Sequence, residues 1–432
     1  MKRTLAFGGV AAGLLATALV ASPAHANPFK PEAKPLAETN FAAKQVAAFW
    51  FGQKMANLVN ATPYGAETKV SVKHVSTMPK AMTDVKPGVV ASSGEKKATG
   101  TSKNVNLPRT SGKVFFIGAD HKPHWCSATA LQSMHKNLVA TAGHCVYDTV
   151  KGKDLMDKWV FVPGYYNGKT PYGIYVGKIA YTHFDFTTYG DGDFDYAFVA
   201  VYNGVLPTDG GTSGGRYESR LYKSKWDAYK AKDQLAKDKT TAYSDLKVVP
   251  VYADPKPSPS PSASASPSAS PSPSKTLLGY KVVGLKLSIA LKDVGKLGDN
   301  VGGQGLAYNQ KVGQPTFVFG YPSGSHPDGN YAFSGKTLKY SYGKTFPATA
   351  SALKGEALQG IKSSFTGEGA SGSAWLYKYN NSTRFGYLNG VTIGVSDTDG
   401  NNRYDTSVSP YFDGETLAIY KAAAATPSAN IV

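Results

Sequence analysis

The stretch LVATAGHCV, residues 138–146, is an apolar run that closes with a glycine, a histidine, a cysteine and a valine. Its leucine, valine, alanine and threonine residues, followed by Gly143, are typical of a short buried strand that leads into a turn. His144 and Cys145 at the end of such a strand are compatible with a metal site, a redox site, a packed core position or half of an active site. The remainder of the chain distinguishes between these interpretations.

The N-terminus has the features of a secretory signal peptide. Lys2 and Arg3 precede an apolar stretch at residues 5–20, and residues 24–26 form an A-x-A cleavage signal. A transmembrane anchor would instead require about 20 apolar residues without such small-residue breaks. We therefore predict that the protein is exported, that the signal ends at Ala26, and that the mature protein is extracellular.

The chain contains two cysteines, Cys126 and Cys145. In the oxidising environment outside the cell, two such cysteines are favoured to be joined rather than free. Metal binding would require further Cys or His partners at short spacing, but the chain has no C-x-x-C or H-x-x-x-H motif. We therefore expect no metal site, and a bridge that stabilises the fold by about 3 kcal/mol.

The chain is strongly basic, with a formal net charge of +17 that falls by two when Lys2 and Arg3 leave with the signal. The lysines are scattered, and no nucleic-acid recognition motif accompanies them. We therefore expect no specific nucleic-acid partner. The charge favours adhesion to anionic polymers of a cell wall.

Short apolar runs dominate the chain from residue 114 onward. Examples are VFFIG, KWVFVPGYY and DYAFVAVY, and Gly, Asn and Asp residues separate them at intervals of about 8 to 12 residues or somewhat more. The same texture resumes at residue 281 with KVVGLKLSIAL. This pattern predicts an all-β sandwich or barrel.

Two segments differ from this texture. The first has helix-forming composition at Phe41–Val59 and continues into a polar stretch at residues 86–113. The second is an insert at residues 206–278 with a mixed-charge helical stretch at residues 219–239 and a Ser/Pro-rich tract at Pro255–Lys275. Because a Ser/Pro tract cannot bury a core, it either separates domains or decorates a surface loop.

Three motifs that fit nucleophilic catalysis occur in the order His, Asp, Ser. His144 follows an apolar strand, Asp195 opens the run DYAFVAV, and Ser371 lies between glycines in TGEGASGSAWL. Acyl transfer needs these residue types, because a serine hydroxyl must lose its proton to an imidazole that a carboxylate orients. Asp191 and Asp193 alternate with Asp195. We prefer Asp195 because it abuts the apolar strand, with Asp193 as the alternative.

At these motifs the sequence resembles secreted serine endopeptidases of the chymotrypsin fold, in the bacterial trypsin-like and glutamyl-endopeptidase branch. The resemblance covers residues 112–421 apart from the insert. It rests on GKVFFIG, CSATAL with LVATAGHCV, DYAFVAV, FVFGYP, GEGASGSAWL and LNGVTIGVS. It implies two six-stranded antiparallel β-barrels of the chymotrypsin type, with the site in the cleft between them.

The resemblance also implies a role for individual residues. His144 matches the general base, Asp195 the carboxylate that orients it, and Ser371 the nucleophile. The N–H groups of Gly369 and Ser371 match the oxyanion hole. No organic cofactor is implied.

Further matches concern the brace of the site and the contacts to substrate. Cys126 and Cys145 match the disulfide that braces the histidine loop, and residues 390–394 match the strand that pairs with the substrate backbone. The resemblance places substrate contacts at Phe365, Thr366, Thr392 and Gly394.

The sequence departs from the family pattern at three positions. Ala370 stands where animal members have an aspartate that pairs with a freed N-terminus. Phe365 stands where an acidic residue would select Lys or Arg, and Thr392 where glutamyl-specific relatives place a histidine. The cleavage preference is therefore left open.

The function that we expect is that of an exported, monomeric serine endopeptidase that acts on proteins or peptides. The alternatives are a catalytically silent binding protein on the same fold and an α/β-hydrolase esterase, but an esterase would need G-x-S-x-G and the order Ser, Asp, His. The predicted organisation is a signal peptide at 1–26, a propeptide or accessory segment at 27–111, the peptidase domain at 112–421 and a tail at 422–432.

Overall fold

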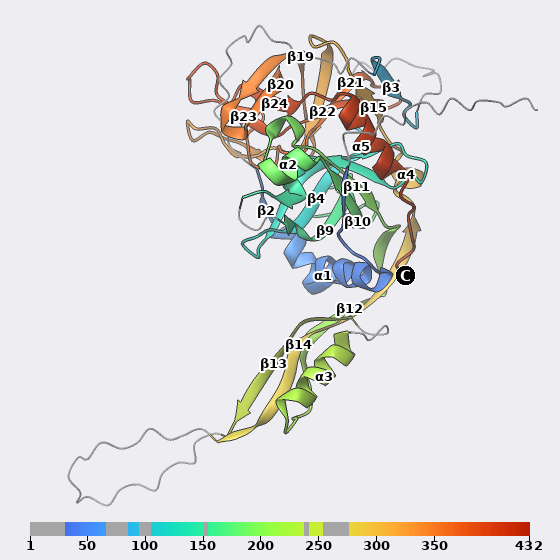
Figure 1. Ribbon diagram of the computed structural model, residues 1–432, viewed down its shortest axis with the longest axis vertical. Coiled ribbons are helices and arrows are strands. Elements are labelled where there is room, and N and C mark those ends of the chain that lie inside the picture. The colour runs from blue at the N-terminus through green and yellow to red at the C-terminus, as the bar shows by residue number, and fades with distance from the viewer. Residues whose placement is uncertain (1–30, 66–84, 95–104, 151–153, 237–241, 254–275) are drawn as a thin grey trace, which may run out of the picture.

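The computed structural model of the protein describes residues 31–65, 85–94, 105–150, 154–236, 242–253 and 276–432. The predicted signal peptide and the Ser/Pro tract lie outside the described residues. Figure 1 shows a body that contains the two large sheets, with helix α1 (Asn40–Val59) packed on one of them. An arm of three strands and one helix extends away from this body.

Six antiparallel strands close into a barrel, as predicted for the first half of the domain. Strand β9 closes the ring β4–β5–β6–β11–β10, because it pairs with both β4 and β10. The strands are β4 (Ser111–Ile117), β5 (Pro123–Leu131), β6 (Leu138–Thr141), β9 (Asp157–Pro163), β10 (Tyr175–Thr182) and β11 (Ala197–Val201). The apolar stretch at residues 138–146 therefore supplies strand β6 of the barrel and the turn that follows it.

Both faces of the barrel wall are buried, which explains why its strands are apolar almost without interruption. In β4, Val114 and Phe116 belong to the inner core, whereas Phe115 between them packs on the outside against Trp50 of α1, with ring centroids 5.7 Å apart. Helix α1 begins after Thr39, whose hydroxyl caps its first turn. Because successive side chains of a strand point to opposite faces, β4 contributes to two separate apolar clusters.

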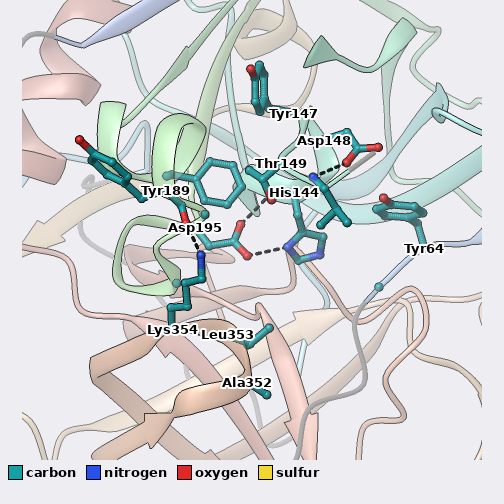
Figure 2. Close-up of a pocket in the computed structure, with 15 residues that line it drawn as sticks. Tyr64, His144, Tyr147, Asp148, Thr149, Tyr189, Asp195, Ala352, Leu353 and Lys354 are labelled. Carbon is teal, nitrogen blue, oxygen red and sulfur yellow. Dashed lines mark hydrogen bonds and ion pairs between the residues drawn. The ribbon is translucent and has the colours of Figure 1, made fainter. Parts of the chain in front are cut away.

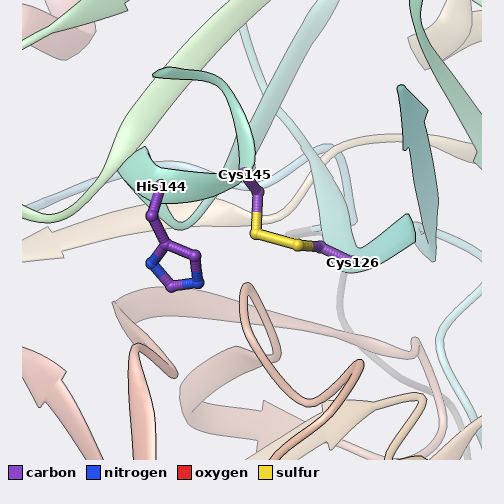
Figure 3. Close-up of side chains that lie close together, drawn as sticks. All are labelled: Cys126, His144 and Cys145. Carbon is purple, nitrogen blue, oxygen red and sulfur yellow. A yellow bond between two sulfur atoms is a disulfide. The ribbon is translucent and has the colours of Figure 1, made fainter. Parts of the chain in front are cut away.

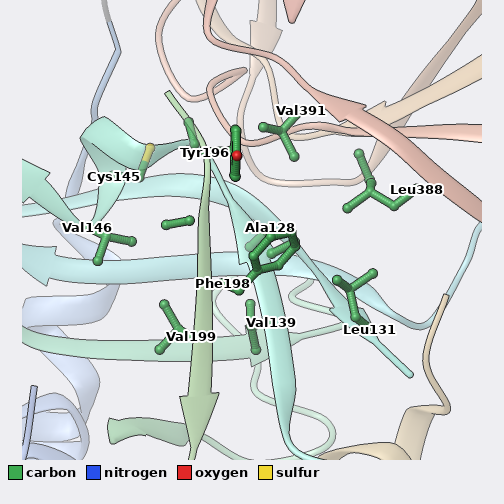
Figure 4. Close-up of a cluster of buried hydrophobic side chains, with 14 of the residues drawn as sticks. Ala128, Leu131, Val139, Cys145, Val146, Tyr196, Phe198, Val199, Leu388 and Val391 are labelled. Carbon is green, nitrogen blue, oxygen red and sulfur yellow. The ribbon is translucent and has the colours of Figure 1, made fainter. Parts of the chain in front are cut away.

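The inner apolar cluster joins the barrel to the second sheet. Figure 4 shows Val139 and Phe198 of the barrel in one cluster with Leu388 and Val391 of β22 (Phe385–Val391). Each of these four side chains is completely buried. The barrel and the second sheet therefore share a core, and groups from both can meet at their boundary.

The second large sheet has nine strands in the order β23–β24–β20–β19–β16–β21–β22–β15–β3. Besides β22, they are β3 (Gly88–Val90), β15 (Gly305–Tyr308), β16 (Pro315–Gly320), β19 (Lys339–Ala350), β20 (Gly355–Lys362), β21 (Ala374–Asn380), β23 (Gly394–Ser396) and β24 (Thr406–Pro410). Among the described residues, no pairing joins the two end strands, β23 and β3. The sheet is therefore not seen to close, and the second predicted barrel is not confirmed.

The insert forms the arm. Strands β12 (Gly204–Glu218) and β13 (Ala242–Tyr252) both pair with β14 (Leu277–Gly295) in antiparallel fashion. Helix α3 (Lys225–Ala236) packs on this sheet through the buried Ala228. This helix is the one that the mixed-charge stretch of the insert predicts.

Three short strands attach the N-terminal segment to the body. Strand β1 (Glu32–Pro35) pairs with β10, β2 (Thr62–Pro63) pairs in parallel with β5, and β3 pairs with β15. The segment before residue 111 is therefore in contact with the barrel and with the second sheet.

The remaining elements are short, apart from the C-terminal helix α5, which packs beside β10 and β11. They are β7 (Tyr147–Asp148), β8 (Asp154–Leu155), β17 (Ser323–Ser325), β18 (Tyr331–Ser334), α2 (Phe184–Tyr189), α4 (Leu297–Val301) and α5 (Gly414–Ala424). Within the described part of the chain, no helix combines the length and the apolar character needed to span a bilayer.

Candidate active site

His144 and Asp195 are joined by two hydrogen bonds (Figure 2). His144 Nδ1 lies 2.7 Å from Asp195 Oδ2, and the backbone N–H of His144 donates to Asp195 Oδ1 at 2.8 Å. Because the carboxylate accepts a hydrogen bond from Nδ1–H, the neutral imidazole has its lone pair on Nε2. Nε2 is buried and has no hydrogen-bond partner among the described residues. In this arrangement, Nε2 of His144 is available to accept a proton.

Asp193, the alternative acid, faces a different partner. Its carboxylate accepts the backbone N–H groups of Glu356 at 3.0 Å and Ala357 at 2.9 Å, both in β20 of the second sheet. Burial raises the pKa of Asp193 to about 6, and these hydrogen bonds oppose the shift. Asp193 thus connects the two halves of the body, and Asp195 is the aspartate that contacts His144.

Cys126 and Cys145 form a disulfide beside the histidine (Figure 3). Their sulfur atoms and a ring nitrogen of His144 lie within 4.8 Å of one another, which is close enough for a shared metal ion. Both sulfurs, however, are bonded to each other, and a disulfide offers no thiolate ligand. The three residues lie close together because the disulfide holds the turn that carries His144 against strand β5.

Ser371 lies in a tight loop that is hydrogen-bonded to the barrel. Its carbonyl accepts the N–H of Ser127 at 2.8 Å, and Ser127 directly follows Cys126. Gly372 adopts φ +79°, and a Cβ there would lie 2.0 Å from the carbonyl oxygen of Ser127, so a larger residue does not fit. The disulfide therefore links the strand that holds Ser371 to the turn that carries His144.

Gly369 occupies a similarly restricted position. It adopts φ +75°, and a Cβ there would lie 2.2 Å from the indole ring of Trp125. On the barrel side, the buried Lys113 places Nζ 3.2 Å from the centroid of the same indole. Burial holds the pKa of Lys113 well below its usual range. The indole is thus packed between a lysine and the loop that leads to the serine.

The local sequence around Tyr64 and Gly65 does not identify them as residues of this region. The carbonyl of Tyr64 accepts the N–H of Gly369 at 3.2 Å, and a Cβ on Gly65 would lie 2.9 Å from Ser371 Oγ. The proline and glycine of ATPYG, residues 61–65, predict a turn after a helix and nothing more. Nothing in this stretch indicates a partner far along the chain.

A cavity of about 400 Å³ opens beside the His144–Asp195 pair. Residues 352–354, which precede β20, line it from the second sheet, and Tyr64 and Gly65 border it as well. The cavity therefore lies between the two halves of the body, where the resemblance predicts the site.

The residues expected to contact substrate are buried around the serine loop. Phe365 belongs to an apolar cluster of the second sheet, and Thr366 Oγ1 donates to the carbonyl of Ser323 at 2.7 Å. Thr392 Oγ1 accepts the indole N–H of Trp375 at 2.9 Å, and Gly394 begins β23. The hydroxyls of both threonines thus have partners within the protein.

The position before the serine offers no counter-charge for an ammonium. Ala370 is fully buried in the same apolar cluster as Phe365. Glu368, two residues earlier, is exposed. An N-terminal ammonium buried next to Ser371 would therefore not find a buried carboxylate at either position.

No protein-family model and no curated protein matches the chain. Among solved structures, it is similar to the protease Anisep from Arthrobacter nicotinovorans, with 22% identity over 74% of this chain and 98% of that chain, at a TM-score of 0.44. A thermostable serine protease, AL20, from an extremophilic microorganism gives 21% identity, the same coverages and a TM-score of 0.44. A Glu endopeptidase gives 13% identity over 77% of this chain and 99% of that chain, at a TM-score of 0.40. The first of these proteins is named as a protease, the second as a serine protease and the third as a Glu endopeptidase.

Proposed function

We propose that the protein is an exported serine endopeptidase that hydrolyses peptide bonds through His144, Asp195 and Ser371. The observation that carries this proposal is the pair of hydrogen bonds that His144 donates to Asp195, which leaves a buried Nε2 without a partner among the described residues. A packed structural histidine would have both ring nitrogens satisfied. A base with a free lone pair is what the activation of a serine requires.

In the proposed reaction, His144 Nε2 takes the proton of Ser371 Oγ while Oγ forms a bond to the carbonyl carbon of the substrate. The N–H groups of Gly369 and Ser371 stabilise the oxyanion that results. His144 then gives its proton to the leaving amine, and the C–N bond breaks to leave an acyl-enzyme. Water, deprotonated by His144, releases the acid product and restores the serine.

The finer assignments of the sequence analysis are part of this proposal. Thr366, Thr392 and Gly394 would surround the residue that precedes the scissile bond, and Phe365 would make the base of that pocket apolar. The second sheet would be the second barrel of the fold, and residues 27–111 a propeptide or accessory segment. The disulfide supports export, because such bonds persist outside the cell.

The test is the replacement of the nucleophile. We expect Ser371→Ala to lower the cleavage of casein by the processed protein by several powers of ten, because members of a triad act as a unit. The exposed Ser364 provides the matched control, and Ser364→Ala should retain parental activity.

A catalytically silent binding protein would give a different result. In that case the parent would not cleave casein, and a fluorophosphonate would not label Ser371 in the full chain or after limited proteolysis. Substantial casein cleavage by Ser371→Ala would show that another residue is the nucleophile.

A further inference from the structure

A strap of five residues, Ala61–Gly65, crosses the region of Ser371. It is anchored upstream by α1, whose Trp50 and Leu58 are buried against the barrel, and downstream by β3 on the second sheet. Two anchored flanks keep the strap at a high effective concentration next to the site.

The strap binds to β5 as an added strand. Thr62 and Pro63 pair in parallel with His124 and Trp125, and the N–H of Tyr64 donates to the carbonyl of Trp125 at 2.9 Å. The indole N–H of Trp125 donates in turn to the carbonyl of Ala61 at 3.1 Å. Backbone pairing of this kind is a common way for a protein to hold an extended peptide.

The end of the strap occupies groups that the proposed reaction needs. The carbonyl of Tyr64 accepts the N–H of Gly369, which would otherwise be free for the oxyanion. Gly65 approaches Ser371 so closely that even a methyl group on it would lie 2.9 Å from both Oγ and the carbonyl oxygen of Gly367. A substrate carbonyl could not take the same place while the strap is bound.

The side chain of Tyr64 fixes this position. Its ring packs on Phe116 edge to face, with centroids 5.3 Å apart, and lies beside the ring of His144 with centroids 6.2 Å apart. Figure 2 shows Tyr64 and Asp195 on opposite sides of the imidazole. Burial, and secondarily the charges of nearby aspartates, raises the pKa of Tyr64 to about 12, so the phenol stays neutral over the working range of pH.

We infer that Ala61–Gly65 is a built-in peptide inhibitor, which binds across Ser371 and Gly369 and keeps the full chain latent until the strap is displaced or cut away. This inference rests on the proposed function. It adds a binding site for an extended peptide with an aromatic residue followed by glycine, and it names the segment of this chain that fills that site.

The test measures how fast a fluorophosphonate labels Ser371 in the full chain from residue 27. We expect slow labelling of the parent. Tyr64→Ala, which removes the ring contacts, and Gly65→Ala, which adds a methyl group against Oγ, should be labelled at least about tenfold faster, because both raise the fraction of molecules with an open site. Tyr64→Phe should remain slow.

Two controls keep the outcomes apart. Tyr166→Ala removes an exposed tyrosine outside the strap and should be labelled like the parent. A synthetic peptide with the sequence NATPYG should slow the labelling of Tyr64→Ala, and the same peptide with alanine in place of tyrosine should not. Peptide competition also supports the inference if Gly65→Ala fails to fold.

Two results would overturn the inference and leave the proposed function standing. One is equally fast labelling of parent, Tyr64→Ala and Gly65→Ala. The other is cleavage between Tyr64 and Gly65 in the parent, detected by mass spectrometry and lost in Ser371→Ala, because the strap would then be a substrate. If no form of the protein is labelled, even after limited proteolysis, the proposed function and the inference both fail.

Discussion

Asp193 and Asp195 are two positions apart in the chain and have different partners. Asp195 receives two N–H groups of His144, whereas Asp193 receives two backbone N–H groups of β20. With a pKa of about 6, Asp193 is largely ionised at pH 8 and accepts both of its bonds there. One aspartate thus orients the proposed base, and the other connects the two halves of the body.

This difference predicts that the same substitution lowers kcat far more at Asp195 than at Asp193. At pH 8, Asp195→Asn should lower kcat by about four orders of magnitude, because an amide N–H directed at Nδ1 forces His144 into the tautomer that has its proton on Nε2. Asp193→Asn should lower kcat by less than about tenfold, because it weakens a contact away from the reacting atoms. The measurement is the hydrolysis of a small peptide ester by the processed enzyme.

The two variants serve as controls for each other, since each removes one negative charge from the same turn. A larger loss of kcat in Asp193→Asn than in Asp195→Asn, with both proteins folded by circular dichroism, would contradict the proposed role of Asp195.

At the level of elements, two segments from different sheets hold the serine loop. Strand β5 binds the carbonyl of Ser371 through Ser127, and the backbone of Thr392 accepts the N–H of Gly372 at 2.7 Å and donates to the carbonyl of Ser373 at 3.0 Å. The disulfide connects β5 to the turn after β6. The loop is therefore held by elements of both sheets.

Removal of the disulfide should lower stability more than it lowers activity. For the double variant Cys126→Ser and Cys145→Ser, we expect the free energy of unfolding to fall by about 3 kcal/mol, because the unfolded chain regains the entropy of an open loop. The hydrogen bonds that His144 donates to Asp195 remain, so most of kcat should persist. Urea unfolding of the double variant and of the parent, each with Ser371→Ala to prevent self-digestion, measures the difference. An unchanged midpoint would show that the bridge does not constrain the unfolded chain.

At the level of the whole molecule, the arm extends from the end of the body where α1 lies (Figure 1), and none of its described residues lines the cavity beside His144. Its strands β13 and β14 are already close where the Ser/Pro tract connects them. Tyr252 pairs with Leu277, and the N–H of Ala253 donates to the carbonyl of Thr276 at 2.8 Å. The two ends that the tract joins therefore have the separation of a hairpin.

The tract should accordingly be dispensable for the chemistry. Replacement of residues 255–275 by a short Gly/Ser turn is expected to keep kcat/KM on a small peptide ester within a few-fold of the parent. The tract consists of serines and prolines with three alanines and two lysines, so it has no large apolar side chain to add to either core. Peptide-ester hydrolysis and the yield of exported protein are the two readouts. A collapse of either one would show that the tract contributes to the body of the enzyme.

Patterns close together in the sequence predicted the short buried strands and the pairing of the two cysteines, and they named His144, Asp195 and Ser371 as candidates. Nearly uninterrupted apolar runs indicate which strands are buried, and two cysteines allow one pairing within the chain. The sequence favoured Asp195 over Asp193 but could not exclude Asp193, because alternating residues in a turn point in directions that the fold sets. The second barrel is not confirmed, since the closure of a sheet depends on its edge strands.

The tertiary structure alone decided what lies next to Ser371. Tyr64 and Gly65 are separated from it by most of the chain, and ATPYG has no feature beyond that of a turn. Their contact depends on the packing of α1 on the barrel and of β3 on the second sheet, which together bring the strap across the loop. Local sequence encodes backbone propensity and burial, whereas a contact between distant segments is a property of how the packed elements are arranged.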